Sequence, residues 1–98
     1  MASHRQYSVY IITNRPEGVL YIGVTSDLRK RMWQHINGKY EGFSKTYKLH
    51  RLVYYESFQL VGNAIRREKQ LKKWTRRKKL GLIHIQNPQW DDLAAMWF

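Results

Sequence analysis

Two short apolar segments separated by a tight polar turn constrain the fold of this chain most. Residues 7–13 (YSVYIIT) and 19–24 (VLYIGV) are rich in the β-branched and aromatic side chains typical of strands. The intervening NRPEG contains Pro16, which fixes φ and favours a turn. The pattern therefore predicts an antiparallel hairpin. Because the strands are apolar on both faces, we expect helices to cover the sheet on each side.

The remainder of the chain predicts alternating helices and strands. The first expected helix runs from the candidate N-caps Thr25, Ser26 and Asp27 to about Asn37, and Gly38 is its expected stop. A loop over 39–49, a strand over 50–58 and a long helix over 61–79 that ends near Gly81 are expected to follow. The last expected elements are a minor strand or extended segment over 82–86 and a short final helix over 89–97. The sequence thus predicts an α/β sandwich with a small mixed or antiparallel sheet.

Length and composition exclude several classes of protein. The 98 residues fit one domain, which we expect to span 1–98. The chain has no cysteine, which excludes disulfides, zinc–thiolate sites and a thiol nucleophile. It has no apolar signal segment and no apolar run long enough to span a bilayer. These features predict a soluble, cytoplasmic protein without a membrane partner.

The chain carries a large excess of positive charge. It has 18 Lys and Arg against 7 Asp and Glu, a formal net charge of +11. A field of that sign attracts polyanions, and nucleic acid is the commonest of them. An acidic protein, an anionic membrane surface or a solvated helix face are the alternatives. The candidate nucleic-acid-binding residues are Lys45, Lys48, Arg66, Arg67, Lys69, Lys72, Lys73, Arg76 and Arg77.

One carboxylate interrupts the basic run of the predicted long helix. Glu68 falls near the middle of the apolar stripe of that helix, which contains Val61, Ala64, Ile65, Leu71 and Trp74. A carboxylate on such a face is costly to desolvate unless a cation compensates its charge. That cation is either a basic side chain, as in an i,i+4 pair with Lys72, or a hard divalent metal ion such as Mg²⁺, which often takes only one or two protein carboxylates.

Two basic and two phenolic side chains are further candidates. Arg31 and His35 lie four residues apart on one side of the first predicted helix. They are either basic residues whose stems lie along apolar surface or a clamp for phosphate oxygens. Tyr10 and Tyr21 lie in the paired strands, where a buried tyrosine is commonly an apolar filler. Together with Glu68, these residues include the base, the cation and the metal ligand that hydrolysis requires.

Five segments, in order, resemble the motifs of the GIY-YIG nuclease superfamily. They are Ser8-Val9-Tyr10 and Tyr21-Ile22-Gly23 for the two namesake motifs, the stretch YIGVTSDLRKRMWQH with Arg31 and His35, the stretch NAIRREKQLKKW with Glu68, and Asn87 in IQNPQW. The first motif has Ser8 where glycine is usual and Val9 in place of isoleucine. The likeness runs from about Tyr7 to Leu93 and is greatest to the compact, stand-alone bacterial branch.

The resemblance implies a fold and a set of roles. The fold is a three-stranded antiparallel sheet flanked by helices in the order β-β-α-β-α-α. Glu68 would bind Mg²⁺ or Mn²⁺, and Arg31 would neutralise charge on the phosphoryl oxygens. Tyr10 would be the general base, in which case Tyr21 would orient water or phosphate. His35 is the alternative base or a proton relay, and Asn87 would position Tyr10 or water.

The expected function is that of a metal-dependent endonuclease. It would hydrolyse phosphodiester bonds in DNA with low sequence specificity, since phosphate contacts carry no sequence information. DNA repair or recombination is the expected setting. The alternative is a non-catalytic module of the same fold that binds DNA or RNA. The oligomeric state is left open by the sequence.

Overall fold

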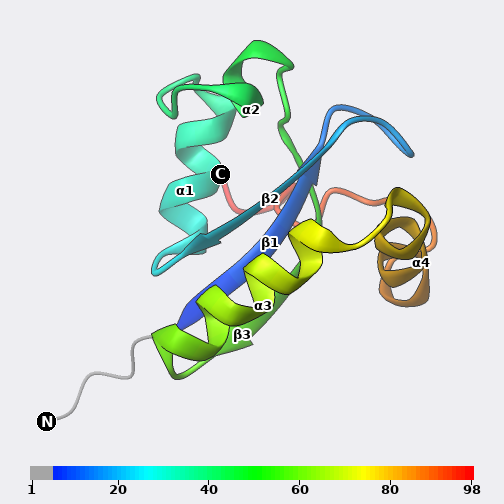
Figure 1. The fold of residues 1–98 in the computed structure, drawn as a ribbon. Coiled ribbons are helices and arrows are strands. Elements are labelled where there is room, and N and C mark those ends of the chain that lie inside the picture. The colour runs from blue at the N-terminus through cyan, green and yellow to red at the C-terminus, as the bar shows by residue number, and fades with distance from the viewer. Residues whose placement is uncertain (1–5) are drawn as a thin grey trace, which may run out of the picture.

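The computed structural model describes residues 6–98, and its centre is a three-stranded antiparallel sheet. The strands are β1 (Tyr7–Thr13), β2 (Leu20–Thr25) and β3 (Arg51–Phe58), in the spatial order β2-β1-β3. The helices are α1 (Leu28–Ile36), α2 (Phe43–Thr46), α3 (Val61–Lys73) and α4 (Arg76–Gln86). Figure 1 shows α1 and α3 on opposite sides of the sheet. The predicted fold class is therefore confirmed.

The sheet is buried on both faces, as the apolar hairpin predicted. The face toward α3 and α4 carries a core of Val9, Ile11, Ile22, Val53, Tyr54, Ala64, Leu71, Ile83 and Trp90. The face toward α1 carries a second core of Tyr10, Ile12, Met32, Leu49, Leu52 and Ala94. The central strand β1 alternates between the two cores, because successive side chains of a strand point to opposite faces. Tyr10 therefore faces α1.

The first helix begins and ends as its sequence predicts. Among the three candidate N-caps, Asp27 is the residue whose side chain accepts a hydrogen bond from the Lys30 backbone N–H, at 3.1 Å. The helix ends at Ile36 with Asn37 as its C-cap, and Gly38 follows with a φ of 66°. Glycine adopts this left-handed conformation without steric cost, which explains its place at the helix end.

The predicted long helix over 61–79 is wrong, since the structure has two helices there. Trp74 ends α3 with an extended backbone, at ψ 150°, and Thr75 caps α4 by accepting a hydrogen bond from the Lys78 backbone N–H. The predicted minor strand over 82–86 is also wrong, because these residues form the end of α4. Gly81, the predicted helix end, lies inside α4. Of the predicted apolar stripe, Val61 and Ile65 are exposed.

Two other expected segments differ from the structure. The predicted loop over 39–49 contains the single helical turn α2. The predicted final helix over 89–97 is a series of turns, tied to β3 by hydrogen bonds that the Leu52 N–H donates to Asp92 Oδ1 and the Leu93 N–H donates to the Leu52 carbonyl. Within residues 6–98, no helix has both the length and the apolar character needed to cross a membrane.

Candidate active site

The register of the β1–β2 hairpin leaves space for one buried phenol. Tyr10 pairs with Gly23, and Ile12 pairs with Tyr21, so Tyr10 and Tyr21 share the face toward α1. The two rings lie 6.3 Å apart between centroids. The Tyr10 ring packs over Gly23, where a Cβ would approach its hydroxyl oxygen to 2.5 Å. Tyr10 is fully buried, whereas Tyr21, on the edge strand, is half-buried.

His35 connects Tyr10 to α2. The Tyr10 hydroxyl oxygen lies 2.9 Å from His35 Nε2, and His35 Nδ1 lies 2.7 Å from Ser44 Oγ. His35 and Ser44 are both buried. Burial lowers the pKa of His35 to about 4, and the positive charge of Arg31 and the nearby His50 act in the same direction. The imidazole is therefore neutral at pH 7 and has one N–H to donate.

The two phenols both resist ionisation. Burial raises the pKa of Tyr10 well above its ordinary value, although Arg31 opposes that shift. Burial and the neighbouring Tyr40 hydroxyl raise the pKa of Tyr21 to about 12, with Arg31 lowering it and the carboxylate of Glu68 raising it further. The phenolate that a role of Tyr10 as general base requires is therefore disfavoured, because desolvation favours the neutral phenol.

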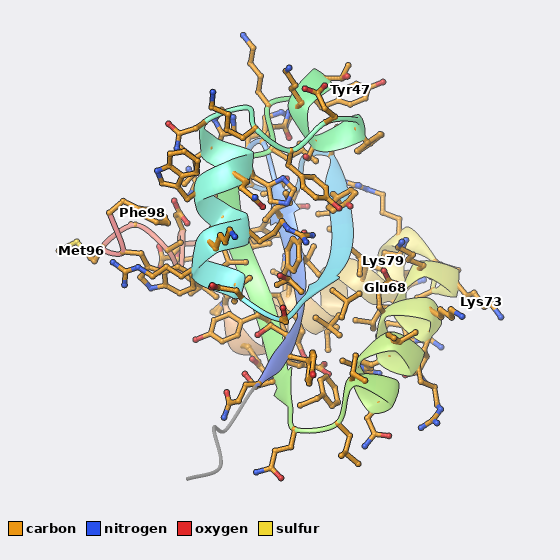
Figure 2. All side chains as sticks on the ribbon, turned by 90° about the vertical axis from the view of Figure 1, so that its left-hand side faces the viewer. Tyr47, Glu68, Lys73, Lys79, Met96 and Phe98 are labelled. Atoms are coloured by element: carbon orange, nitrogen blue, oxygen red, sulfur yellow. The ribbon has the colours of Figure 1, made fainter. Side chains whose placement is uncertain are left out.

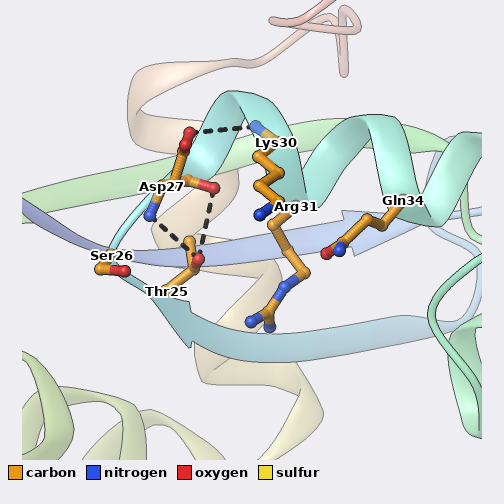
Figure 3. Close-up of a pocket in the computed structure, with 6 residues that line it drawn as sticks. All are labelled: Thr25, Ser26, Asp27, Lys30, Arg31 and Gln34. Atoms are coloured by element: carbon orange, nitrogen blue, oxygen red, sulfur yellow. Dashed lines mark hydrogen bonds between the residues drawn. The ribbon is translucent and has the colours of Figure 1, made fainter.

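Arg31 lies at the accessible side of this group. Its guanidinium stacks over the ring of Tyr40, at 4.3 Å from the ring centroid, in a cation–π contact. The side chain also reaches a polar depression of about 340 Å³ at the beginning of α1 (Figure 3). That depression is lined by Thr25, Ser26, Asp27, Lys30, Arg31 and Gln34. Two cationic side chains at its wall make it suited to an anion such as phosphate.

Glu68 approaches the group from the other side of the edge strand. Glu68 lies on α3, whereas Arg31 lies on α1. In Figure 2, β2 lies between α1 and Glu68. Its side chain is 15 % exposed, and its Oε2 lies 3.2 Å from Lys72 Nζ. The i,i+4 pair with Lys72 that the sequence allowed is therefore present. The charge of Glu68 also makes a small contribution to the raised pKa of Tyr21, after burial and Tyr40.

The donor set is compatible with a metal held by a single carboxylate. No group of three or more His, Cys, Asp or Glu side chains comes together anywhere in residues 6–98. Mg²⁺ commonly binds through one or two carboxylates and completes its coordination with water and substrate phosphate. The Glu68 carboxylate offers hard oxygen ligands, and its partner Lys72 is 52 % exposed, so the ammonium group can turn into solvent.

Comparison with known proteins identifies the family of the chain. The sequence model of the GIY-YIG catalytic domain matches residues 6–80. The chain belongs to the GIY-YIG family. A UPF0213 protein of Staphylococcus saprophyticus is 36 % identical over 78 residues, which cover 80 % of this chain and 94 % of that protein. A UPF0213 protein of Bacillus pumilus is 34 % identical over 79 residues, covering 81 % of this chain and 79 % of the relative.

A solved structure has the same fold. The solution NMR structure of a UPF0213 protein from Bacillus halodurans aligns with a TM-score of 0.58 and 27 % sequence identity, covering 93 % of this chain and 97 % of that one. The resemblance inferred from the five motifs is thereby confirmed. The two namesake motifs of the family meet in the structure, where Tyr10 of the first pairs with Gly23 of the second across β1 and β2.

The structure places Asn87 at the end of α4, against β3 and the C-terminal turns. It is the buried C-cap of α4. Its Nδ2 donates hydrogen bonds to the carbonyl oxygens of Val53, at 3.0 Å, and Asp91, at 2.9 Å, and its Oδ1 accepts one from the Asp91 N–H. All three bonds are to backbone atoms. They join the end of α4 and the C-terminal turns to β3, which is the role that the geometry of Asn87 supports.

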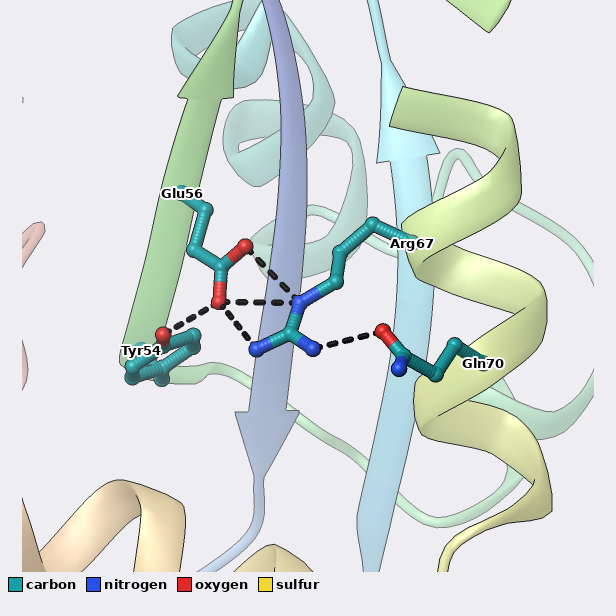
Figure 4. A network of polar contacts seen from close by, with 4 residues as sticks. All are labelled: Tyr54, Glu56, Arg67 and Gln70. Atoms are coloured by element: carbon teal, nitrogen blue, oxygen red, sulfur yellow. Dashed lines mark hydrogen bonds and ion pairs between the residues drawn. The ribbon is translucent and has the colours of Figure 1, made fainter. Parts of the chain in front are cut away.

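Arg67 differs most from its predicted role in binding nucleic acid. Its guanidinium forms a bidentate pair with Glu56 on β3, with Nε 3.0 Å from Oε1 and Nη2 2.9 Å from Oε2. Figure 4 shows this pair between α3 and the sheet, together with Tyr54 and Gln70. Burial raises the pKa of Glu56, but Arg67 and Tyr54 outweigh burial and hold it below the ordinary value. The Arg67 guanidinium is therefore engaged in an ion pair that holds α3 against the sheet.

The other predicted basic residues divide into engaged and exposed side chains. Arg76 Nη2 donates to the carbonyl oxygens of Glu17 and Gly18, at 2.7 and 2.8 Å, and so fastens α4 to the β1–β2 turn. Surface contacts join Arg66 to Asn63 and Lys45 to Glu41. Exposed side chains remain at Lys48, Lys69, Lys73 and Arg77. These four, with Lys72, are the better candidates for phosphate contacts.

Sequence reasoning did not find three residues of the site. Tyr40 and Ser44 lie in a segment without periodicity, and they reach Arg31 and His35 only through the folding of α2 onto α1. Gly23 was noted only as part of the second GIY-YIG motif. The alternation of the hairpin could have placed it opposite Tyr10, since residues that pair across two strands point to the same face.

Proposed function

We propose that this chain is a divalent-metal-dependent endonuclease that hydrolyses phosphodiester bonds in DNA with low sequence specificity. The observation that carries the proposal is the cluster around Tyr21, in which the His35 ring lies 5.8 Å from the Tyr21 ring and Arg31 stacks on Tyr40, whose ring lies 4.8 Å from that of His35. The charges of Arg31 and Glu68 both act on the pKa of Tyr21. A cation for phosphate, an oxygen ligand for metal and a hydroxyl thus lie around one edge of the sheet. Membership of the GIY-YIG family supports the same assignment.

In this proposal Glu68 holds the metal ion, Mg²⁺ or Mn²⁺, once Lys72 turns away. A bound divalent cation at this carboxylate would act as a Lewis acid and stabilise the leaving oxygen. The Lys72 ammonium, which balances Glu68 in the unliganded chain, then becomes available to a DNA phosphate. The exchange requires only the rotation of one exposed lysine side chain.

Arg31 binds the scissile phosphate, and Tyr21 orients the attacking water. The depression at the beginning of α1 brings Arg31 to solvent, where its guanidinium can neutralise charge that develops on the phosphoryl oxygens. Tyr21 is accessible and Tyr10 is fully buried, so we assign the water contact to Tyr21 rather than to Tyr10. With a pKa of about 12, Tyr21 stays protonated at pH 7 and orients water through its oxygen lone pairs.

Tyr10, His35 and Ser44 support this arrangement from the interior of the protein. Their hydrogen-bonded chain runs from the centre of the sheet to α2 and fixes both rings beside Tyr21. His35 is neutral at pH 7, so in the tautomer with its proton on Nδ1 it accepts a hydrogen bond from Tyr10 and donates one to Ser44. A phosphate at Arg31 would offset one of the charges that lower the pKa of His35, which makes the imidazole a better proton acceptor when substrate is present.

The binding surface follows from the exposed basic residues. Lys69, Lys73 and Arg77 on α3 and α4, with Lys48 after α2, provide positive charge without the geometry to read base edges. Low sequence specificity is the part of the proposal that rests on this surface, and DNA repair or recombination is the setting that we propose with it. The second candidate, a non-catalytic module that binds DNA or RNA, is favoured by the pairing of Glu68 with Lys72.

Nicking of a supercoiled plasmid with Mg²⁺ or Mn²⁺ separates the two candidates. We expect the wild type to nick the plasmid, and Glu68→Gln and Arg31→Ala to reduce nicking by about 100-fold or more, which is the range seen when a transition-state contact is removed. Glu41→Gln is the matched control, because Glu41 also forms an i,i+4 pair with a lysine but is 80 % exposed. Equal nicking by all four proteins, or binding of plasmid and of a single-stranded oligonucleotide without cleavage of either in both metals, would overturn the proposal.

A further inference from the structure

The short helix α2 presents two aromatic side chains to solvent beside the site. Phe43 is 46 % exposed and Tyr47 is 50 % exposed, and their ring centroids lie 4.6 Å apart. Figure 2 shows Tyr47 at the outer end of the molecule, on α2. We call this exposed pair the aromatic platform. Large aromatic side chains usually bury most of their surface, so two adjacent exposed rings require an explanation.

The aromatic platform is continuous with the site. Phe43 stacks on Tyr21, with centroids 6.3 Å apart and an interplanar angle of 21°. Between the two platform residues, Ser44 turns inward, is 2 % exposed and contacts His35. The same helical turn therefore holds Ser44 against His35 and Phe43 against Tyr21, with Tyr47 packed on Phe43. An aromatic ring system runs without interruption from Tyr10 and Tyr21 to the surface.

The charge around the aromatic platform indicates the chemistry of its ligand. Lys39, Lys45 and Lys48 lie in the same segment and are exposed, and within residues 39–48 Glu41 is the one acidic residue. A protein partner that covered these rings with apolar side chains would also need many acidic side chains to balance the charge of the lysines. A nucleic-acid strand presents both a flat aromatic base and a phosphate to the same neighbourhood, and bases stack on exposed aromatic rings next to basic residues.

We propose that the aromatic platform of Phe43 and Tyr47 stacks an unpaired base next to the phosphate bound at Arg31. The inference rests on the proposed function for the position of that phosphate, and it names the substrate class: strands with unpaired nucleotides at the cleavage position. In a duplex both faces of each base are covered by its neighbours, so a base reaches the platform only after it leaves the stack. Single strands, flaps and frayed ends meet no such cost.

Binding to oligonucleotides with and without bases tests the inference directly. The probes are oligothymidylate and a fully abasic strand of the same length, which carry the same number of phosphates. Affinity is measured without divalent metal, so that no cleavage is needed. We expect the wild type to bind oligothymidylate at least about tenfold more tightly than the abasic strand, since stacking on one aromatic side chain contributes a factor of that order or more.

The variants assign that preference to the aromatic platform. The doubly substituted Phe43→Leu, Tyr47→Leu protein keeps apolar side chains against Tyr21 and should bind both strands equally. Phe98→Ala is the control, because Phe98 is 58 % exposed but lies in the C-terminal turns. It should retain the wild-type preference. A wild type that binds both strands equally, or a double variant that keeps the preference, overturns the inference.

The same proteins separate this inference from the proposed function. If the wild type cuts neither plasmid nor a single-stranded oligonucleotide but prefers oligothymidylate through Phe43 and Tyr47, the proposed nuclease activity fails and the base-stacking surface stands. If it nicks plasmid and shows no preference between the strands, the nuclease stands and the platform fails. If both proposals hold, the wild type should cut single-stranded DNA in preference to duplex DNA. The doubly substituted protein should lose that preference.

Discussion

The backbone of Gly23 lies so close to the ring of Tyr10 that a Cβ at position 23 would stand 2.5 Å from both the Cζ atom and the hydroxyl oxygen. The two residues pair across β1 and β2, and both are buried. The absence of a side chain at Gly23 therefore provides the volume that the Tyr10 phenol occupies. Because Tyr10 then reaches His35, the packing of the hairpin determines the position of the imidazole.

Gly23→Ala is expected to displace Tyr10 and to reduce both stability and nicking. Overpacking a buried site of this kind costs about 1–3 kcal/mol of unfolding free energy, which urea denaturation measures. Gly62→Ala is the matched control, since no atom lies within 4 Å of a Cβ there and the residue lies in α3. Its substitution should stabilise the protein by roughly 0.5–1 kcal/mol through helix propensity. A Gly23→Ala protein with wild-type stability and activity would contradict the packing relationship.

The burial of His35 is expected to make stability depend on pH. Its pKa is about 4 in the folded chain, against 6.5 for an unperturbed histidine, so the unfolded chain binds more protons between these values. The contribution of His35 to stability is therefore complete above about pH 6.5 and is lost as the pH falls toward 4. Thermal melts of the wild type and of His35→Gln, taken from pH 7 to pH 4, isolate this effect from the other groups.

The expected result is a difference in pH dependence between the two proteins. The wild type should lose more stability than His35→Gln over that interval, because glutamine does not titrate and can still form hydrogen bonds with Tyr10 or Ser44. Arg31 and His50 also lower the pKa of His35, and both are retained in the two proteins, so the comparison differs at position 35 alone. Parallel curves for the two proteins would mean that His35 is not buried in its neutral form.

Arg67 is expected to contribute to stability and not to DNA binding. Arg67→Met leaves the partly buried Glu56 carboxylate without its ion-pair partner, so we expect a loss of about 1–3 kcal/mol in unfolding free energy. Affinity for duplex DNA and its salt dependence should stay unchanged. Arg77→Met, at an exposed position, should leave stability unchanged and reduce the log–log salt slope by about 0.9 if that side chain contacts one phosphate. If Arg67→Met instead weakened DNA binding and left stability unchanged, Arg67 would belong to the DNA-binding surface.

The sequence predicted those features of the fold that depend on local pattern. The β-branched hairpin, the Asp27 cap and the Gly38 stop all follow from residue types at short spacing, and all three are confirmed. The break between α3 and α4 was missed because the basic residues on both sides of Trp74 continue a helical pattern. Thr75, a favourable N-cap, was the available signal.

The site was only partly predictable because its residues meet through tertiary contacts. The resemblance to the GIY-YIG motifs pointed to Tyr10, Tyr21, Arg31 and Glu68, but it did not indicate which phenol is accessible. That difference arises because Tyr10 lies on the central strand and Tyr21 on the edge strand. Likewise, the ion pair of Arg67 with Glu56 joins residues from α3 and β3, which no short-range pattern relates.

The central claim is that Glu68 and Tyr21, from opposite sides of the edge strand, serve one reaction. Single-turnover cleavage rates of a single-stranded oligonucleotide, measured with saturating Mg²⁺ for the wild type, Glu68→Gln, Tyr21→Phe and the double variant, test it most directly. We predict that each single substitution lowers the rate by about 100-fold or more and that the double variant is no slower than the slower single one, since groups that act together are not additive. Independent losses that multiply in the double variant, or a Tyr21→Phe protein with the wild-type rate, would contradict the account.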